Sequence, residues 1–90
     1  MELTLDGMEI NSIEQLHKLL KEKLQLPEYY GENLNALWDC LTAWVDMPLK
    51  ISWLHFQESK RILGSSAEEF LELFRDAEDE LEGFTFEVIL

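Results

Sequence analysis

Negatively charged side chains carry all of the formal charge in the stretch between Lys23 and Lys50. They are Glu28, Glu32, Asp39 and Asp46. The same stretch contains two adjacent tyrosines and two tryptophans, and rigid aromatic side chains are enriched where protein interfaces hold most of their binding energy. Carboxylates bind cationic groups, so we interpret this stretch as a binding surface for a basic partner.

A helix must position the centre of this surface. Successive helical residues advance by about 100° around the axis, so side chains three, four, seven and eleven positions apart share one face. This spacing predicts an apolar stripe of Leu34, Leu37, Trp38, Leu41 and Val45. The same geometry predicts a polar arc about 60° wide. We call it the central ridge, and it consists of Asn35, Asp39, Thr42 and Asp46.

The predicted start of this helix is Asn33, whose side-chain oxygen can accept a hydrogen bond from an amide of the first turn. Gly31 permits a sharp bend just before it, which would bring Tyr29 and Tyr30 beside the central ridge. Adjacent tyrosines also occur as lids over a core, and a lone aspartate such as Asp39 often only faces solvent. The position of these aromatic residues next to the charged ridge favours a recognition surface.

Enzymatic chemistry has little support in the sequence. The candidate side chains are Cys40, His17 and His55, and none belongs to a motif such as HExxH, GxSxG or CxxC. Asp39 disfavours a thiolate at the neighbouring Cys40, which we interpret as a small buried residue. We expect His17 and His55 to be either surface residues or core residues with hydrogen-bond partners. A small hydrolase that pairs Asp39 with a histidine is the enzymatic alternative, and histidines placed away from the central ridge would exclude it.

Composition restricts the class of partner. The 90 residues include 19 acidic and 7 basic side chains, with a formal net charge of -12, whereas nucleic acids and anionic membranes require a basic surface. No apolar run approaches the roughly 20 residues that span a bilayer, and the N-terminus lacks the features of a signal peptide. A single cysteine excludes an internal disulfide. We expect one cytoplasmic domain, residues 1–90, that binds neither nucleic acid nor membranes.

The acidic run from Asp76 to Glu82 raises the question of calcium. These residues are predicted to be helical and cannot all converge on one ion, because calcium sites usually need a loop with fixed spacing. Glu78, Asp79 and Glu82 are expected to face solvent, with at most weak, non-specific cation binding. We expect no metal site, no cofactor and no catalytic residue.

Three segments are predicted to be strands. Residues 2–6 and 49–53 alternate apolar and polar side chains. Residues 84–90 become nearly continuous in apolar character, which is typical of a central strand. Helical segments separate the strands, which favours parallel pairing with right-handed crossovers. We predict an α/β fold with a three-stranded parallel sheet packed against about four helices.

The first predicted helix begins at a capping box of Ser12 and Gln15. It continues through about residue 25, and Pro27 stops it. The central helix region is predicted to end at Pro48.

A short third helix covers residues 56–63 and ends at Gly64, which suits a left-handed cap. The last helix opens on a second capping box of Ser66 and Glu69. It buries a stripe of Ala67, Phe70, Phe74, Ala77 and Leu81. A second acidic arc about 60° wide lies on this helix. We call it the C-terminal ridge, and it consists of Glu69, Leu73, Asp76 and Glu80.

Over its whole length the chain resembles the barstar family, intracellular inhibitors of secreted ribonucleases of the barnase type. The similarity is most specific in the segments LPEYYGENL, ALWDCLT and WV, and it extends through LHKLLKEKL, PLKISW, FQESK and LELFRDA. The resemblance implies the three-stranded parallel sheet with helices. It also implies a one-to-one inhibitor that plugs the active site of a basic, guanyl-preferring ribonuclease. We expect the free protein to be a monomer.

The resemblance places Asp39 at the phosphate site of the enzyme, where its carboxylate stands in for an RNA phosphate among arginines and the catalytic histidine. Tyr29 would cover that histidine. The other implied contacts are Gly31, Asn33, Leu34, Asn35, Trp38, Thr42, Trp44, Leu73, Asp76 and Glu80. The two ridges would then be the two halves of one interface.

Three features depart from the family pattern. Asn35 stands where the family has an aspartate, and Asp76 stands where it has a longer glutamate. These changes weaken charge pairs or mark a differently shaped enzyme, so a barstar-like module that neutralises a different basic nuclease or toxin is the alternative function. The second cysteine of barstar is absent, which bears on redox chemistry and not on binding.

The family also has a cis proline where this chain has Met47-Pro48. X-Pro bonds are mostly trans, so the sequence does not decide between the cis and the trans isomer here.

Overall fold

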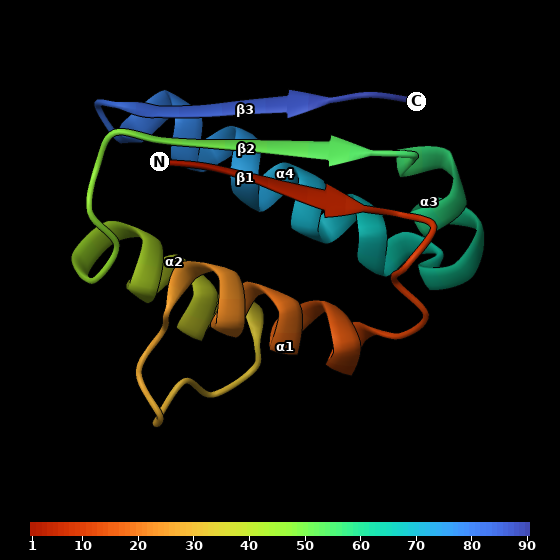
Figure 1. Ribbon diagram of the computed structural model, residues 1–90, viewed down its shortest axis with the longest axis horizontal. Coiled ribbons are helices and arrows are strands. Elements are labelled where there is room, and N and C mark those ends of the chain that lie inside the picture. The colour runs from red at the N-terminus through yellow and green to blue at the C-terminus, as the bar shows by residue number, and fades with distance from the viewer.

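Three strands form one parallel sheet in the computed structural model, which describes residues 1–90 (Figure 1). They are β1 (Glu2–Asp6), β2 (Leu49–Leu54) and β3 (Phe84–Val88), and β2 lies in the middle. Helical segments connect the strands, and parallel strands need connections of that length. The predicted three-stranded parallel sheet is confirmed.

Strand β3 lies at an edge of the sheet, so the prediction that it is central is wrong. Phe84 and Phe86 are buried, while Thr85 and Glu87 are exposed. The apolar run that suggested a buried strand continues past β3, and the last two residues of the chain are exposed. Strand β2, by contrast, has no exposed residue, which is the pattern of a middle strand.

Four helices accompany the sheet, as predicted. They are α1 (Ile13–Leu24), α2 (Leu34–Ala43), α3 (Phe56–Leu63) and α4 (Ser65–Glu80). In Figure 1, α3 lies beyond the carboxyl ends of the strands, and the loop between α1 and α2 projects away from the sheet. None of the four helices combines the length and the apolar character that crossing a bilayer requires.

The core lies on one face of the sheet, beneath the helices. It contains 21 buried apolar side chains, and both predicted helical stripes contribute to it, with Leu37 and Leu41 from α2 and Phe70 and Phe74 from α4. Trp53 of β2 is fully buried, and its ring meets Phe74 edge-on with the centroids 6.2 Å apart. Burial of apolar surface is the main contribution that stabilises such a fold.

The other face of the sheet is open. Thr4, Ser52 and Glu87 lie side by side across the three strands on this face, and each is exposed or half-buried. The molecule therefore has two layers, and α2 and α4 present their outer sides on the face opposite the open sheet.

Helix α1 begins at the predicted cap. The Ser12 hydroxyl accepts a hydrogen bond from the Gln15 amide at 3.0 Å. The Gln15 side-chain oxygen accepts a hydrogen bond from the amide of Asn11 at 2.6 Å. A capping box would use the amide of Ser12 instead. Gln25 adopts the left-handed conformation with φ 52° and ψ 50°, so the helix ends before Pro27 is reached.

Helix α2 ends at Ala43, earlier than predicted. Val45 and Asp46 lie beyond it, so Asp46 does not extend the central ridge, whereas Val45 still packs against the core. The amides of Trp44 and Val45 both donate to the Cys40 carbonyl at 2.9 Å, which closes the last turn. The helical part of the central ridge is therefore one turn shorter than the spacing indicated.

Helix α4 begins at Ser65, directly after Gly64, and no side chain caps it. The predicted capping box of Ser66 and Glu69 is wrong. Gly64 has a φ of 62° and turns the chain from α3 straight into α4, so Ser66 lies inside the first turn. The prediction that Gly64 ends α3 is confirmed.

The connection from α2 to β2 passes through a cis peptide bond between Met47 and Pro48. Gly83 packs against this connection with a φ of 89°. This conformation favours glycine, and a Cβ atom at Gly83 would also make a tight contact of 3.2 Å with the Cβ of Met47.

Candidate protein-binding surface

The outer side of α2 carries the polar residues that the sequence grouped together. Asn35, Asp39 and Thr42 are all exposed, whereas Leu37 and Leu41 on the opposite side are buried in the core. The buried side fixes the helix on the sheet, so the outer side is held rigidly in solvent. The central ridge is confirmed as a surface feature of α2, apart from Asp46.

The start of α2 is fixed by the predicted cap. The Asn33 side-chain oxygen accepts from the amide of Ala36 at 2.8 Å, and its side-chain nitrogen donates to the carbonyl of Gly31 at 3.3 Å. The left-handed residue of this loop is Glu32, with a φ of 52°, and not Gly31. A Cβ atom at Gly31 would lie 3.2 Å from the Asn33 side-chain nitrogen. The glycine thus gives room to the cap and does not supply the bend.

The two adjacent tyrosines serve different purposes. Tyr30 is buried, and its hydroxyl lies 2.6 Å from Nδ1 of His17. Burial raises the pKa of Tyr30, which keeps the hydroxyl neutral. Tyr29 is 79% exposed and meets Trp44 edge-on, with the ring centroids 6.4 Å apart. Sequence reasoning treated the tyrosines as one pair, but only Tyr29 belongs to the surface.

Trp44 completes an exposed aromatic pair with Tyr29. Its indole nitrogen donates to the carbonyl of Gln25 at 3.1 Å, so the ring is anchored although it is half-exposed. Aromatic rings held in this way provide contact area with little loss of side-chain entropy on binding. The pair joins the loop between α1 and α2 to the end of α2.

The acidic side chains of both ridges lack partners within the molecule. Asp39, Asp76 and Glu80 take part in none of its side-chain hydrogen bonds or ion pairs through their carboxylates. The four ion pairs of the structure are Lys21–Glu28, Lys50–Glu87, Lys60–Glu68 and Arg61–Glu58, and all lie outside the ridges. Four of the seven basic residues are thus engaged elsewhere, and the ridge carboxylates are free to bind cations from outside.

The two ridges meet along a groove between α2 and α4. The groove is lined by Leu34, Asn35, Trp38, Glu69, Glu72, Leu73 and Asp76. Glu80, the last residue of α4, and the exposed Asp39 lie outside it. Five of the predicted contact residues thus line one groove, while Tyr29, Asp39, Thr42 and Trp44 are exposed outside it.

Glu72 was missing from the predicted surface. It lies three residues after Glu69 and four before Asp76, and these spacings place side chains on one helical face. The arc drawn for the C-terminal ridge was too narrow to include it. A wider arc would have found this residue from the sequence.

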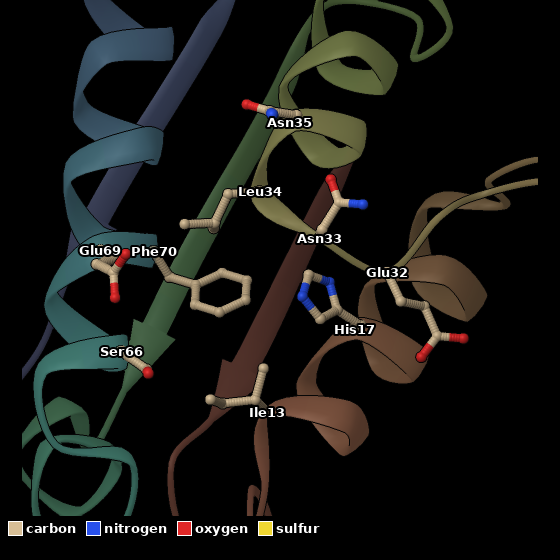
Figure 2. A pocket seen from close by; sticks show the side chains of 9 residues that line it. All are labelled: Ile13, His17, Glu32, Asn33, Leu34, Asn35, Ser66, Glu69 and Phe70. Atoms are coloured by element: carbon tan, nitrogen blue, oxygen red, sulfur yellow. The ribbon is translucent and has the colours of Figure 1, made fainter.

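The remaining reactive side chains do not form a catalytic site with Asp39. Cys40 is buried, and both its desolvation and the neighbouring Asp39 raise the pKa of its thiol, as expected from the sequence. His17 is bonded to Tyr30 and is one of the residues of a cavity beside α2 (Figure 2). His55 is exposed at the start of α3. No hydrogen bond joins either histidine to Asp39, so the pairing that a small hydrolase would need is absent.

Comparison with known proteins agrees with the resemblance seen in the sequence. The family model described as Barstar (barnase inhibitor) matches residues 1–90. A protein of Bacillus subtilis (strain 168), named "Putative ribonuclease inhibitor YrdF", is 47% identical over 88 residues, which cover 98% of this chain and 96% of the relative. The match is thus not confined to one element or one end of the fold. The chain belongs to the barstar family and is an inhibitor protein, not an enzyme.

Proposed function

We propose that this protein inhibits a basic, barnase-like, guanyl-preferring ribonuclease by covering its active site. The observation that carries the proposal is the Asp39 carboxylate, which is exposed and unpartnered on a rigid helix. Family membership supplies the class of target, because the matching family model is described as that of a barnase inhibitor.

The chemistry of RNA cleavage explains why a carboxylate would serve as the plug. A ribonuclease active site must hold a polyanion and stabilise negative charge in the transition state, so it is lined by cationic donors. A carboxylate at a phosphate position makes charge-assisted hydrogen bonds with those donors. Asp39 would take the place of an RNA phosphate, and Tyr29 would cover the catalytic histidine of the enzyme.

The rest of the surface would surround this central contact. From the loop and α2 the proposed contact residues are Gly31, Asn33, Leu34, Asn35, Trp38, Thr42 and Trp44. From α4 they are Leu73, Asp76 and Glu80. The groove between α2 and α4 supports this assignment, because it brings residues of both ridges onto one surface.

The overall charge would act before contact is made. A formal net charge of -12 attracts a basic enzyme and raises the association rate toward roughly 10⁸ to 10⁹ M⁻¹s⁻¹ at low salt. One exposed Asp39 surface per chain fits a one-to-one complex of a monomeric inhibitor. An inhibitor that protects its own cell from a ribonuclease benefits from such speed, and we propose that this one acts in the cytoplasm on an enzyme of the secreted type.

A second candidate is a barstar-like module that neutralises a different basic nuclease or toxin. The neutral side chain of Asn35 in the groove favours it, because all three acidic side chains there come from α4. A target that places its cations nearer to α4 would fit this distribution.

The test is a titration of this protein into barnase at low and moderate salt, with RNA cleavage as the readout. Asp39→Ala is measured in parallel, and Asp79→Ala is the matched control, because Asp79 is an exposed aspartate of α4 that faces Arg75 and β3 instead of the groove. Stoichiometric inhibition that Asp39→Ala alone weakens would support the proposal. Full inhibition by Asp39→Ala would overturn phosphate mimicry, and no inhibition by the unmodified protein would favour the second candidate.

A further inference from the structure

A cavity of about 540 Å³ opens beside the groove, between α1, the start of α2 and α4 (Figure 2). Its volume lies in the range of sites that enclose a ligand group. Leu34, Asn35 and Glu69 line both the cavity and the groove. The cavity is therefore continuous with the proposed interface, although none of the contacts proposed above uses its deeper part.

The inner wall of the cavity contains a buried polar side chain with a free atom. His17 is only 3% exposed, and its Nδ1 is bonded to the Tyr30 hydroxyl. No hydrogen bond of the structure involves Nε2 of this ring. Every fully buried side-chain nitrogen or oxygen has a hydrogen-bond partner. Nε2 has none, so it is not fully buried, and it is accessible from the cavity that His17 lines. Figure 2 shows the imidazole ring of His17 beside Phe70.

The charges around the cavity have one sign. Glu32 from the loop and Glu69 from α4 contribute carboxylates on different sides, and no lysine or arginine lines it. Neither carboxylate takes part in one of the four ion pairs. Burial lowers the pKa of His17, so the ring adds no positive charge near neutral pH. An anionic ligand would be repelled, and an apolar ligand would leave these polar groups without partners.

We propose that this cavity receives an arginine side chain of the ribonuclease, with Nε2 of His17 accepting one of its N–H groups and with Glu69 and Glu32 at opposite rims attracting its positive charge. This requires the tautomer in which Nδ1–H donates to the Tyr30 oxygen. The apolar side chains of Leu34 and Phe70 contact the aliphatic stem.

Arginine fits better than lysine for a geometric reason. The guanidinium presents five donors in a fixed planar fork and is more weakly hydrated than an ammonium group. It can therefore donate to the ring nitrogen with one N–H group and keep its other donors for water or a rim carboxylate. The inference rests on the proposed function and deepens it, because it adds a cation-binding site on the α1 side of the surface, away from Asp39.

The first experiment uses the free protein and a small probe. N-acetylarginine methylamide is titrated into protein with ¹⁵N-labelled histidine, and the Nε2 resonance of His17 is followed by NMR. We expect a saturable shift at millimolar concentrations, a weaker one with the lysine analogue and none with the norleucine analogue. No shift with the arginine probe, or equal shifts with all three, would overturn the inference whether or not a ribonuclease is inhibited.

The second experiment uses the complex. Glu69→Gln should weaken ribonuclease binding about fivefold or more, and Glu32→Gln should weaken it less because its side chain points toward solvent in Figure 2. Glu22→Gln is the control, since Glu22 is exposed on α1 and lines none of the described cavities; it should change affinity less than twofold.

Double-mutant cycles separate this inference from the proposed function. Each surface arginine of the ribonuclease is replaced by alanine and combined with Glu69→Gln. One arginine should couple to Glu69 and should also be needed for the shift of the His17 resonance in the complex. If Asp39→Ala abolishes inhibition while no arginine couples to Glu69, the proposed function stands and this inference fails.

Discussion

The two outer faces of the molecule use the same kinds of charged residue in opposite ways. On the open face of the sheet, Lys50 and Glu87 lie 4.0 Å apart on neighbouring strands. On the face formed by α2 and α4, the carboxylates of Asp39 and Asp76 have no partner in the molecule. The open face thus holds an internal ion pair, whereas these carboxylates of the second face are left for a partner.

Helix α4 repeats this contrast along its own length. Glu68 pairs with Lys60 at 3.0 Å, and Glu78 accepts a hydrogen bond from the amide of Phe86 at 2.9 Å. That second bond covers a free amide on the outer edge of β3, where an unpaired strand could otherwise associate with another chain. Glu69 and Asp76, on the groove side, make no such contacts. Glu78 is exposed as predicted, but its carboxylate also makes this hydrogen bond, which the sequence did not indicate.

The largest effect that would test the comparison is expected at Asp39. Asp39→Ala should weaken the ribonuclease complex by at least about 2 to 5 kcal/mol, because desolvated cations of the enzyme lose their partner; the barnase–barstar complex is itself a reference case for this magnitude. Isothermal titration calorimetry measures the loss. The free energy of unfolding should stay unchanged, and an affinity within a few tenths of a kcal/mol of the unmodified protein would contradict the assignment.

The two adjacent tyrosines allow a residue that stabilises the fold to be compared with one that belongs to the binding surface. Tyr30→Phe should destabilise the fold by about 1 to 3 kcal/mol, because Nδ1 of the buried His17 loses its partner. Tyr29→Phe is the matched control, since the Tyr29 hydroxyl has no hydrogen bond and the ring is exposed. Urea unfolding followed by circular dichroism measures both. Equal stability of the two variants would show that the buried hydrogen bond contributes nothing.

His17 also predicts a dependence of stability on pH. Burial lowers its pKa below the ordinary value of 6.5, and this outweighs the opposing influence of Glu32 and Glu14. The unfolded chain therefore binds a proton at a higher pH than the folded protein does. The contribution of His17 to stability is complete above about pH 6.5 and falls below it by at most about 1.4 kcal/mol per pH unit, until the folded protein is protonated too.

The measurement for this prediction is a series of unfolding curves between pH 7.5 and pH 5.5, taken for the unmodified protein and for His17→Gln. The many carboxylates contribute to both series, so the difference between the two proteins isolates the histidine. Parallel pH dependences would exclude His17 as the cause.

Restoring the family's charge in the groove is expected to have a smaller effect. Asn35→Asp should tighten binding to barnase by about 1 kcal/mol or less, because the added carboxylate remains partly solvated. Competition for barnase between the two proteins measures the change. A weaker complex would count against the mapping of the groove onto the enzyme.

The smallest effect is expected on the open sheet face. Glu87→Gln removes an exposed partner of Lys50 and should change both stability and ribonuclease affinity by less than about 0.5 kcal/mol. A loss of affinity comparable with that of Asp39→Ala would break the distinction between the two faces.

Local sequence patterns determined much of the structure of this protein. The spacing of Leu37 and Leu41, and of Phe70 and Phe74, was enough to orient α2 and α4, because a helix repeats every 3.6 residues and must bury its apolar side. The cap at Asn33 was equally local, since it joins residues three positions apart. The family resemblance over the whole chain added the class of function.

Long-range packing decided what those patterns could not. The sequence did not indicate that Tyr30 would reach His17 while Tyr29 reached Trp44, or that Glu78 would bond to the edge of β3. It placed β3 in the middle of the sheet, because an apolar run is the same whether a strand is flanked on one side or two. It showed two acidic ridges but not the groove between them or the cavity beside it. Each of these depends on contacts between residues far apart in the chain, and only the tertiary structure brings such residues together.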